Sequence, residues 1–210
     1  DPIPLHVSGF GPRALGLAGK HGDGAILGWA PTPEILGRFI SLVRNGAEES
    51  GRPLSPGFRF TALTTVTILD EGEAIDSPRV REECGAMAMA GLHYAYDSWR
   101  QFDAPPPKAA LPIWDEYCAM LAALPEDRRH QRVHAGHNCW VLPEEARFVT
   151  PELIANTCLV GTLDQVTTRL RQYRAAGLDE IIVLPAFEPR YDVIERIGAE
   201  LIPALAEVER

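Results

Sequence analysis

Short apolar runs alternate with amphipathic stretches along the first third of the chain. The runs at 3–8, 25–29 and 58–69 are rich in aliphatic or β-branched residues, as strands are. Between them, apolar positions recur at helical spacing from Pro12 and again from Pro33 to about residue 49. Strands that are apolar on both faces belong to parallel sheets covered by helices, so the pattern predicts βα units in an α/β fold.

Two Thr-Pro-Glu triplets, at 32–34 and 150–152, predict helix starts. Threonine caps the free N–H groups, proline suits the first helical position and the acid favours the first turn. The other elements expected towards the end of the chain are an extended segment at 159–162, a helix that reaches Ala176 and stops at Gly177, a strand at 180–185 and a closing helix from 189 to about 208.

The regular alternation stops after the third strand. Residues 73–132 are mostly helical in pattern, with a stiff proline-rich connector at 104–108, and we interpret them as a helical insertion. Such insertions shape substrate pockets or oligomer contacts. Residues 134–142, which follow, are predicted to form a loop or a short strand.

Composition limits the possible partners. The 210 residues, 46% of them hydrophobic, suit a single domain over 1–210. A net charge of −9 argues against non-specific nucleic-acid binding and against an anionic membrane surface. No apolar run approaches the ~20 residues of a membrane span, and the start of the chain is unlike a signal peptide. The four cysteines have no metal-binding spacing, so we expect reduced, mostly buried thiols and a cytoplasmic protein.

The first strand leads into a Gly-Pro turn and a helix, in the stretch from Ser8 to Ala14. Gly9 and Gly11 allow a sharp turn and the close approach of a ligand. The N–H groups and the dipole of the following helix favour a phosphate, and Arg13 adds a planar positive charge. Most Gly-Pro turns of this kind bind nothing, so the turn alone leaves the function open.

Two stretches together resemble the luciferase-like flavin and deazaflavin oxidoreductases. The first is 4–28, with Ser-Gly-x-Gly-Pro, Ala-Gly and Gly-Asp-Gly-x-Ile-Leu; the second is 160–185, with Val-Gly-Thr-Leu-Asp-Gln-Val and Ala-Gly-Leu-Asp-Glu. The His-Ala-Gly-His segment at 134–137, ahead of 148–153, also looks like the deazaflavin-dependent reductases of this family.

The resemblance implies a (β/α)8 TIM barrel with the cofactor, coenzyme F-420 (a deazaflavin) or FMN, at the C-terminal ends of the strands. By this resemblance, Gly28 and Trp29 would face a small-molecule substrate. The residues expected to bind the cofactor around its phosphate are Ser8, Gly9, Phe10, Gly11, Arg13 and Ala14.

A full barrel needs about 250 residues, and this chain offers about four barrel strands. We therefore expect only the C-terminal half of the barrel, with either a missing N-terminal half or a homo-oligomer that completes it. Alone, a half sheet would expose strand edges and an apolar inner face.

His134 and His137 are the best acid–base candidates, since imidazole titrates near neutral pH. They could equally be solvated or bonded to backbone groups. The His-x-x-His spacing could bind a metal, but no third ligand is evident in the sequence, so no metal is expected.

These observations favour a deazaflavin-dependent reductase or dehydrogenase over an FMN monooxygenase. The alternative is a half-barrel interaction or assembly module that has lost its cofactor, and a metal hydrolase on a barrel is a distant third. Neither the substrate nor the electron acceptor can be read from these residues.

Overall fold

The computed structural model describes residues 3–206. The chain forms two compact units. The first comprises Asp1–Thr64 and Gln165–Val183, and the second comprises Thr65–Asp164 and Leu184–Arg210. The organisation of 1–210 as a single domain stays a prediction, and each unit is described by itself.

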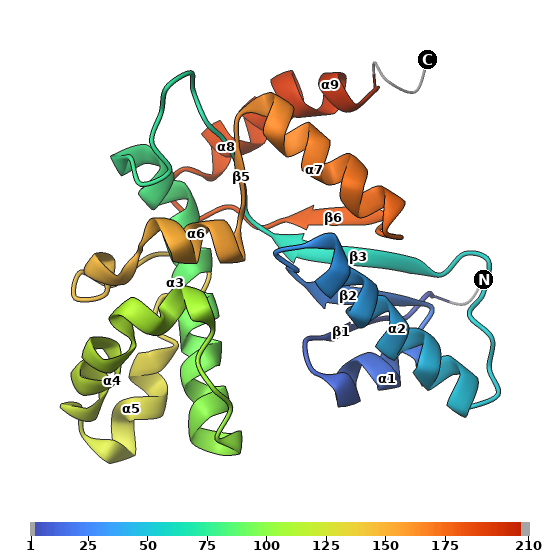
Figure 1. Cartoon of the computed structure of the whole chain (residues 1–210), viewed down its shortest axis with the longest axis horizontal. Coiled ribbons are helices and arrows are strands. Elements are labelled where there is room, and N and C mark those ends of the chain that lie inside the picture. Colours follow the sequence, from blue (N-terminus) through green and yellow to red (C-terminus); the bar gives the residue numbers. More distant parts are fainter. Residues whose placement is uncertain (1–2, 207–210) are drawn as a thin grey trace. The chain divides into compact units, whose positions relative to one another are not determined.

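The first unit is built on a parallel sheet in the order β1-β2-β3-β6 (Figure 1). Its strands are β1 (His6–Gly9), β2 (Gly24–Gly28), β3 (Arg59–Thr64) and β6 (Glu180–Val183). Since all four run the same way, their carboxyl ends lie along one edge of the sheet. That edge is where parallel α/β sheets bind their ligands.

Helices α1 (Pro12–His21), α2 (Pro33–Glu49) and α7 (Leu163–Ala175) pack on one face of this sheet. Their buried side chains meet alternate strand residues such as Leu27 and Ala62, which are register partners. The other face carries Leu63 and Ile182, the latter 40% exposed. The sheet thus presents one packed and one partly open apolar face.

The second unit is mainly helical and holds a parallel pair of short strands, β4 (Val66–Ile68) and β5 (Leu159–Gly161). Its helices are α3 (Pro78–Phe102), α4 (Trp114–Ala122), α5 (Glu126–Val133), α6 (Pro151–Thr157), α8 (Arg190–Arg196) and α9 (Ile202–Ala206). Short 3-10 turns form at Lys108–Ile113 and Ala146–Phe148, and a π-helical turn at Ile197–Leu201 joins α8 to α9.

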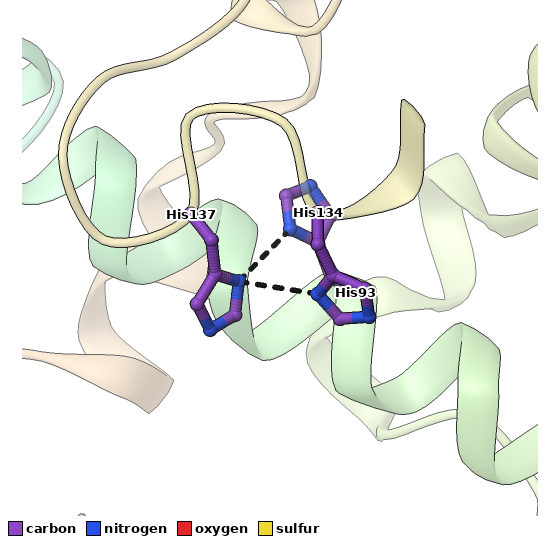
Figure 2. Close-up of side chains that lie close together, drawn as sticks. All are labelled: His93, His134 and His137. Carbon is purple, nitrogen blue, oxygen red and sulfur yellow. Dashed lines mark hydrogen bonds between the residues drawn. The ribbon is translucent and has the colours of Figure 1, made fainter. Parts of the chain in front are cut away.

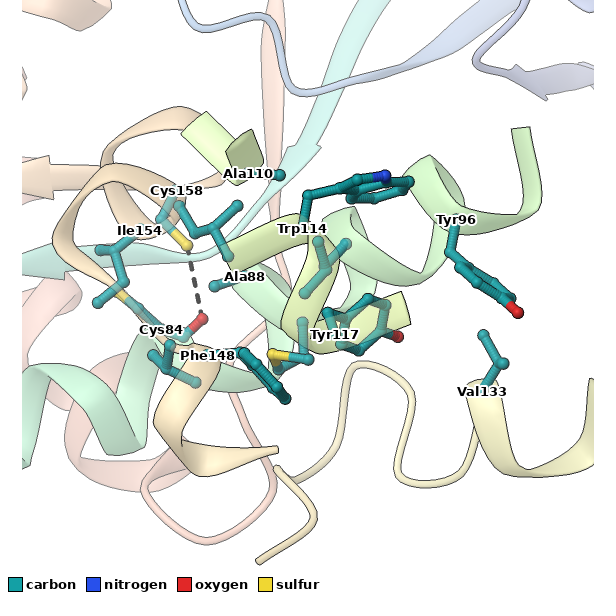
Figure 3. Packing of buried hydrophobic residues seen from close by; sticks show 14 of the residues in the cluster. Cys84, Ala88, Tyr96, Ala110, Trp114, Tyr117, Val133, Phe148, Ile154 and Cys158 are labelled. Carbon is teal, nitrogen blue, oxygen red and sulfur yellow. Dashed lines mark hydrogen bonds between the residues drawn. The ribbon is translucent and has the colours of Figure 1, made fainter. Parts of the chain in front are cut away.

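The core of the second unit gathers around α3 (Figure 3). The ring of Tyr117 meets that of Phe148 edge to face, with centroids 5.4 Å apart. In the same core, the Cys158 thiol donates to the carbonyl oxygen of Cys84 at 3.7 Å, and both residues are fully buried. This core holds α3 in place.

The structure confirms the parallel α/β pattern and the helix starts at Pro12, Pro33 and Pro151. The segment at 73–132 is mostly helical, as its pattern predicts, with α3, α4 and α5 between Pro78 and Val133; that it is an insertion stays a prediction. The segment after α5 is a loop. Within residues 3–206, every helix is too short or too polar to cross a membrane.

Three details of the sequence prediction were wrong. The single strand at 58–69 is two strands with different pairing partners: β3 lies between β2 and β6, whereas β4 pairs with β5. The closing helix is interrupted by the π turn ahead of Pro203, which has no N–H to continue the α-helical ladder; its predicted end at 207–208 lies outside the described residues. Of the four thiols, only Cys84 and Cys158 are buried.

Candidate functional site

The turn between β1 and α1 is tight. Gly9 ends the strand, and a Cβ on it would lie 2.8 Å from the Cβ of Ala14, closer than real contacts allow. Gly11 is the N-cap residue, in extended conformation at φ −112° and ψ 163°, and Pro12 follows in the first turn. The chain therefore turns directly from a strand end into a helix N-terminus.

No side chain caps this helix. Gly11 has none to offer, whereas the other helices that open with proline are capped by Thr32, Ser77 and Thr150. The first N–H groups of α1 thus lack the partner that a cap would supply. Arg13, in the first turn, is exposed. An anion is the natural partner for such an end.

The predicted residues of β1 and β2 come together at the carboxyl edge of the sheet. Gly9 pairs with Leu27, next to Gly28. The ring of Phe10 lies over Gly28, where a Cβ would come within 2.5 Å of it. Ser8 is exposed, and Phe10 is 51% exposed. A ligand at this edge would therefore meet the β1 turn and the end of β2 together.

Trp29 lies just beyond Gly28 and is partly buried. Its ring packs on Tyr173, with centroids 4.8 Å apart, and the Arg169 guanidinium lies 5.7 Å from its centroid. These contacts give Trp29 a packing role within the first unit. Its buried Nε1 has no hydrogen-bond partner among the described residues, so a role towards a ligand stays a prediction.

The second unit brings three histidines together (Figure 2). His93 comes from α3, His134 follows the last residue of α5, and His137 lies in the loop after it. The Nδ1 atom of His137 lies 3.5 Å from Nδ1 of His93 and 3.4 Å from Nδ1 of His134. The two predicted histidines are thus joined by one that the sequence analysis did not single out.

The loop is shaped to aim these rings. Gly136 and Asn138 adopt left-handed backbone conformations, at φ +76° and +59°. A Cβ on Gly136 would lie 2.6 Å from the carbonyl oxygen of Trp140, so only glycine fits there. The tight coil turns the side chains of His134 and His137 toward one another.

The outer nitrogens of the three rings are also engaged. Nε2 of His93 lies 3.2 Å from a carboxylate oxygen of Glu145, and both side chains are only 2% exposed. Nε2 of His134 lies 2.7 Å from a carboxylate oxygen of Asp97. Nε2 of His137 lies 3.2 Å from the Tyr94 hydroxyl. Each ring is therefore held on its far side.

Burial, followed by the positive charges that His93 and His134 can carry, lowers the pKa of His137. Its neutral form is therefore favoured near neutral pH, and a neutral imidazole keeps one unprotonated nitrogen.

Sequence reasoning missed His93, Asp97 and Glu145. The spacing of His93 and Asp97, four residues apart on one helix, puts both on the same face and was the available signal. Glu145 carries no local signal, because it meets His93 only through the fold.

A family model described as luciferase-like monooxygenase matches residues 1–180. The chain belongs to this luciferase-like family. The family resemblance found in the stretches 4–28 and 160–185 is thereby confirmed, with the match reaching residue 180.

The fold is similar to that of solved reductase, dehydrogenase and monooxygenase structures. A coenzyme F-420-dependent tetrahydromethanopterin reductase from Methanopyrus kandleri matches with a TM-score of 0.60 at 21% identity, over 97% of this chain and 51% of its own. An F-420-dependent secondary alcohol dehydrogenase matches with a TM-score of 0.59 at 19% identity, over 98% of this chain and 49% of its own. A long-chain alkane monooxygenase matches with a TM-score of 0.51 at 16% identity, over 97% of this chain and 41% of its own.

At these sequence identities, the structural similarity shows only that the fold is shared. The chain spans about half the length of the two F-420-dependent enzymes. The α/β fold expected from the sequence is confirmed, as a part of the relatives' longer chains.

Proposed function

We propose that this chain is the phosphate-holding part of an oxidoreductase that uses coenzyme F-420 or FMN on a small organic substrate. The observation that carries the proposal is the uncapped N-terminus of α1 at the carboxyl edge of a parallel sheet, in a chain of the luciferase-like family. Both cofactors carry a phosphate group, which suits that end.

The residues of the turn fit such a group. The N–H groups after Gly11 and the dipole of α1 would hold the phosphate, and the exposed Arg13 would neutralise its charge. Gly9 lets the turn close against Ala14. Ser8 and Phe10, beside them, would line the same pocket edge.

When bound, the flavin or deazaflavin ring would supply the hydride or oxygen chemistry. The preference for the deazaflavin rests on the His-Ala-Gly-His segment at 134–137, ahead of 148–153, which looks like the deazaflavin-dependent reductases of this family. Gly28 and Trp29 would border the substrate. An acid–base role of His134 and His137 is a separate proposal for the second unit. A cofactor-free assembly module is the alternative outcome.

The test uses the complete natural protein that carries these residues, titrated with FMN and with coenzyme F-420 while fluorescence is followed. The decisive variant is Gly11→Asp. Position 11 has open space and an N-cap conformation, so an aspartate caps α1 without strain but repels a phosphate. Gly11→Asn is the matched control, because it caps the helix without adding charge.

We expect saturable binding of one cofactor, weakened at least about tenfold by Gly11→Asp and by Arg13→Ala, since charged hydrogen bonds contribute about 1.5–3 kcal/mol. Arg38→Ala, an exposed arginine on α2, should bind like the wild type. If neither cofactor binds, the oxidoreductase proposal fails. If Gly11→Asp binds as tightly as Gly11→Asn, the phosphate lies elsewhere.

A further inference from the structure

The geometry of the three-histidine cluster supports a second role besides the proton transfer proposed for His134 and His137. Ionised carboxylates only accept hydrogen bonds. An ionised Asp97 would accept a hydrogen bond from Nε2 of His134, and an ionised Glu145 would accept one from Nε2 of His93. The neutral forms of both rings then present an unprotonated Nδ1, and both of these nitrogens face Nδ1 of His137.

Lone pairs that converge in this way need an electrophile between them. One answer is a proton on Nδ1 of His137, shared between the other two rings. The other is a metal ion, which would accept lone pairs from all three rings at once. In the second case the proton of His137 sits on Nε2, where the Tyr94 hydroxyl can accept it.

The spacing suits a metal ion. Zinc–imidazole bonds of about 2.0–2.1 Å at tetrahedral angles separate ligand nitrogens by about 3.4 Å. The two measured Nδ1 separations from His137 are 3.4 and 3.5 Å. One nitrogen from each ring lies within 4.8 Å of one from each of the others, so a single ion could reach all three rings.

The groups around the three imidazole rings also suit a metal ion. Metal-binding histidines almost always donate their second N–H to a carboxylate or another acceptor, which fixes the tautomer. Here Asp97, Glu145 and Tyr94 stand in that position. His93 is buried, whereas the side chain of His134 is 36% exposed, so one side of the cluster is open to solvent.

We propose that His93, His134 and His137 bind one divalent transition-metal ion, Zn2+ first among them, through their Nδ1 atoms. Asp97, Glu145 and Tyr94 are positioning residues that hold the rings. Three protein ligands with an exposed side leave a fourth position for water or another small ligand. The site and the acid–base role proposed for His134 and His137 compete for the same lone pairs.

The experiment strips the full chain of metal with a chelator and then titrates Zn2+ against a chromophoric chelator at constant pH. His134→Asn and His137→Asn remove ligands that are not fully buried, so the fold should survive, as circular dichroism would verify. His130→Asn is the matched control, since His130 is exposed on α5, one helical turn before His134. Co2+ in place of Zn2+ reports the coordination geometry through its visible absorption.

We expect one Zn2+ per chain, an intense four-coordinate Co2+ spectrum, and at least about tenfold weaker binding in both ligand variants. Asp97→Asn should weaken binding by about 10- to 100-fold, and Asp97→Glu should restore part of it. His130→Asn should bind like the wild type. Failure of the folded chain to take up Zn2+, or equal uptake by wild type and both ligand variants, overturns the proposal. Cofactor binding is measured separately, so each proposal can fail alone.

Discussion

Gly19 and Gly46 allow α1 and α2 to touch. A Cβ on Gly19 would lie 1.9 Å from the carbonyl oxygen of Val43, and one on Gly46 would lie 2.1 Å from that of Gly16. Both neighbours are backbone atoms, which cannot move aside alone. The two helices can pack this closely only because glycine carries a hydrogen atom at these positions in place of a Cβ.

Alanine substitutions in α2 should therefore have opposite signs. Gly46→Ala should lower the free energy of unfolding by about 2–3 kcal/mol through overpacking. Gly37→Ala, in the same helix but with open space at its Cβ, should raise it by about 0.5–1 kcal/mol. Urea unfolding followed by circular dichroism measures both. Equal effects of the two substitutions would refute the close helix contact.

Glu73 predicts a pH dependence of stability. Hydrogen bonds, first from Arg79 and then from the Asp70 N–H and the Ser77 hydroxyl, lower the pKa of Glu73 from 4.5 to about 2. A lowered folded-state pKa stabilises the protein above the unfolded value, and this stabilisation is lost as pH falls from about 4.5 towards 2.

The comparison is between wild type and Glu73→Gln, which cannot titrate. Between pH 5 and pH 3, the wild type should lose about 1 kcal/mol more of its unfolding free energy than the variant, after allowance for solvent screening. Parallel pH profiles for the two proteins would show that the ion pair with Arg79 contributes nothing.

At the scale of the element, helix starts were the most predictable feature. The proline in the first turn and the capping threonine are local signals, and the side chains of Thr32 and Thr150 do accept from Ile35 and Leu153 N–H. The strand break at Thr65 could not be foreseen, because β3 and β4 pair with different strands that are distant in the sequence, β6 and β5.

The cap at Thr150 gives a prediction for α6. Thr150→Ala should lower the free energy of unfolding by about 1 kcal/mol, because the Leu153 N–H loses its acceptor. Thr150→Ser keeps the hydroxyl and should change stability by only a few tenths. Chemical denaturation of the two variants tests this, and an alanine variant as stable as the serine variant would contradict it.

At the scale of the molecule, the four cysteine thiols differ in their exposure to solvent. Cys139 is exposed, Cys118 is partly buried, and Cys84 and Cys158 lie in the core of the second unit. Burial raises the pKa of the Cys158 thiol, which lowers its reactivity further.

A thiol reagent at neutral pH should therefore modify Cys139 first. Cys84 and Cys158 should react at least about a hundredfold more slowly, at the rate of local opening. Mass spectrometry of peptides after timed labelling measures each site. The same four sites should react at similar rates in denaturant. Rapid native labelling of Cys158 would show that this core opens readily.

The sequence by itself determined the parallel βα pattern and the turn from Ser8 to Ala14, because strands, glycine turns and helix starts are set by neighbouring residues. It also pointed to His134 and His137. Only the tertiary structure brought His93 to them, across 44 residues from His137, and placed Glu145 behind it. That assembly depends on how α3 packs in its core, and no local pattern encodes the packing of distant segments.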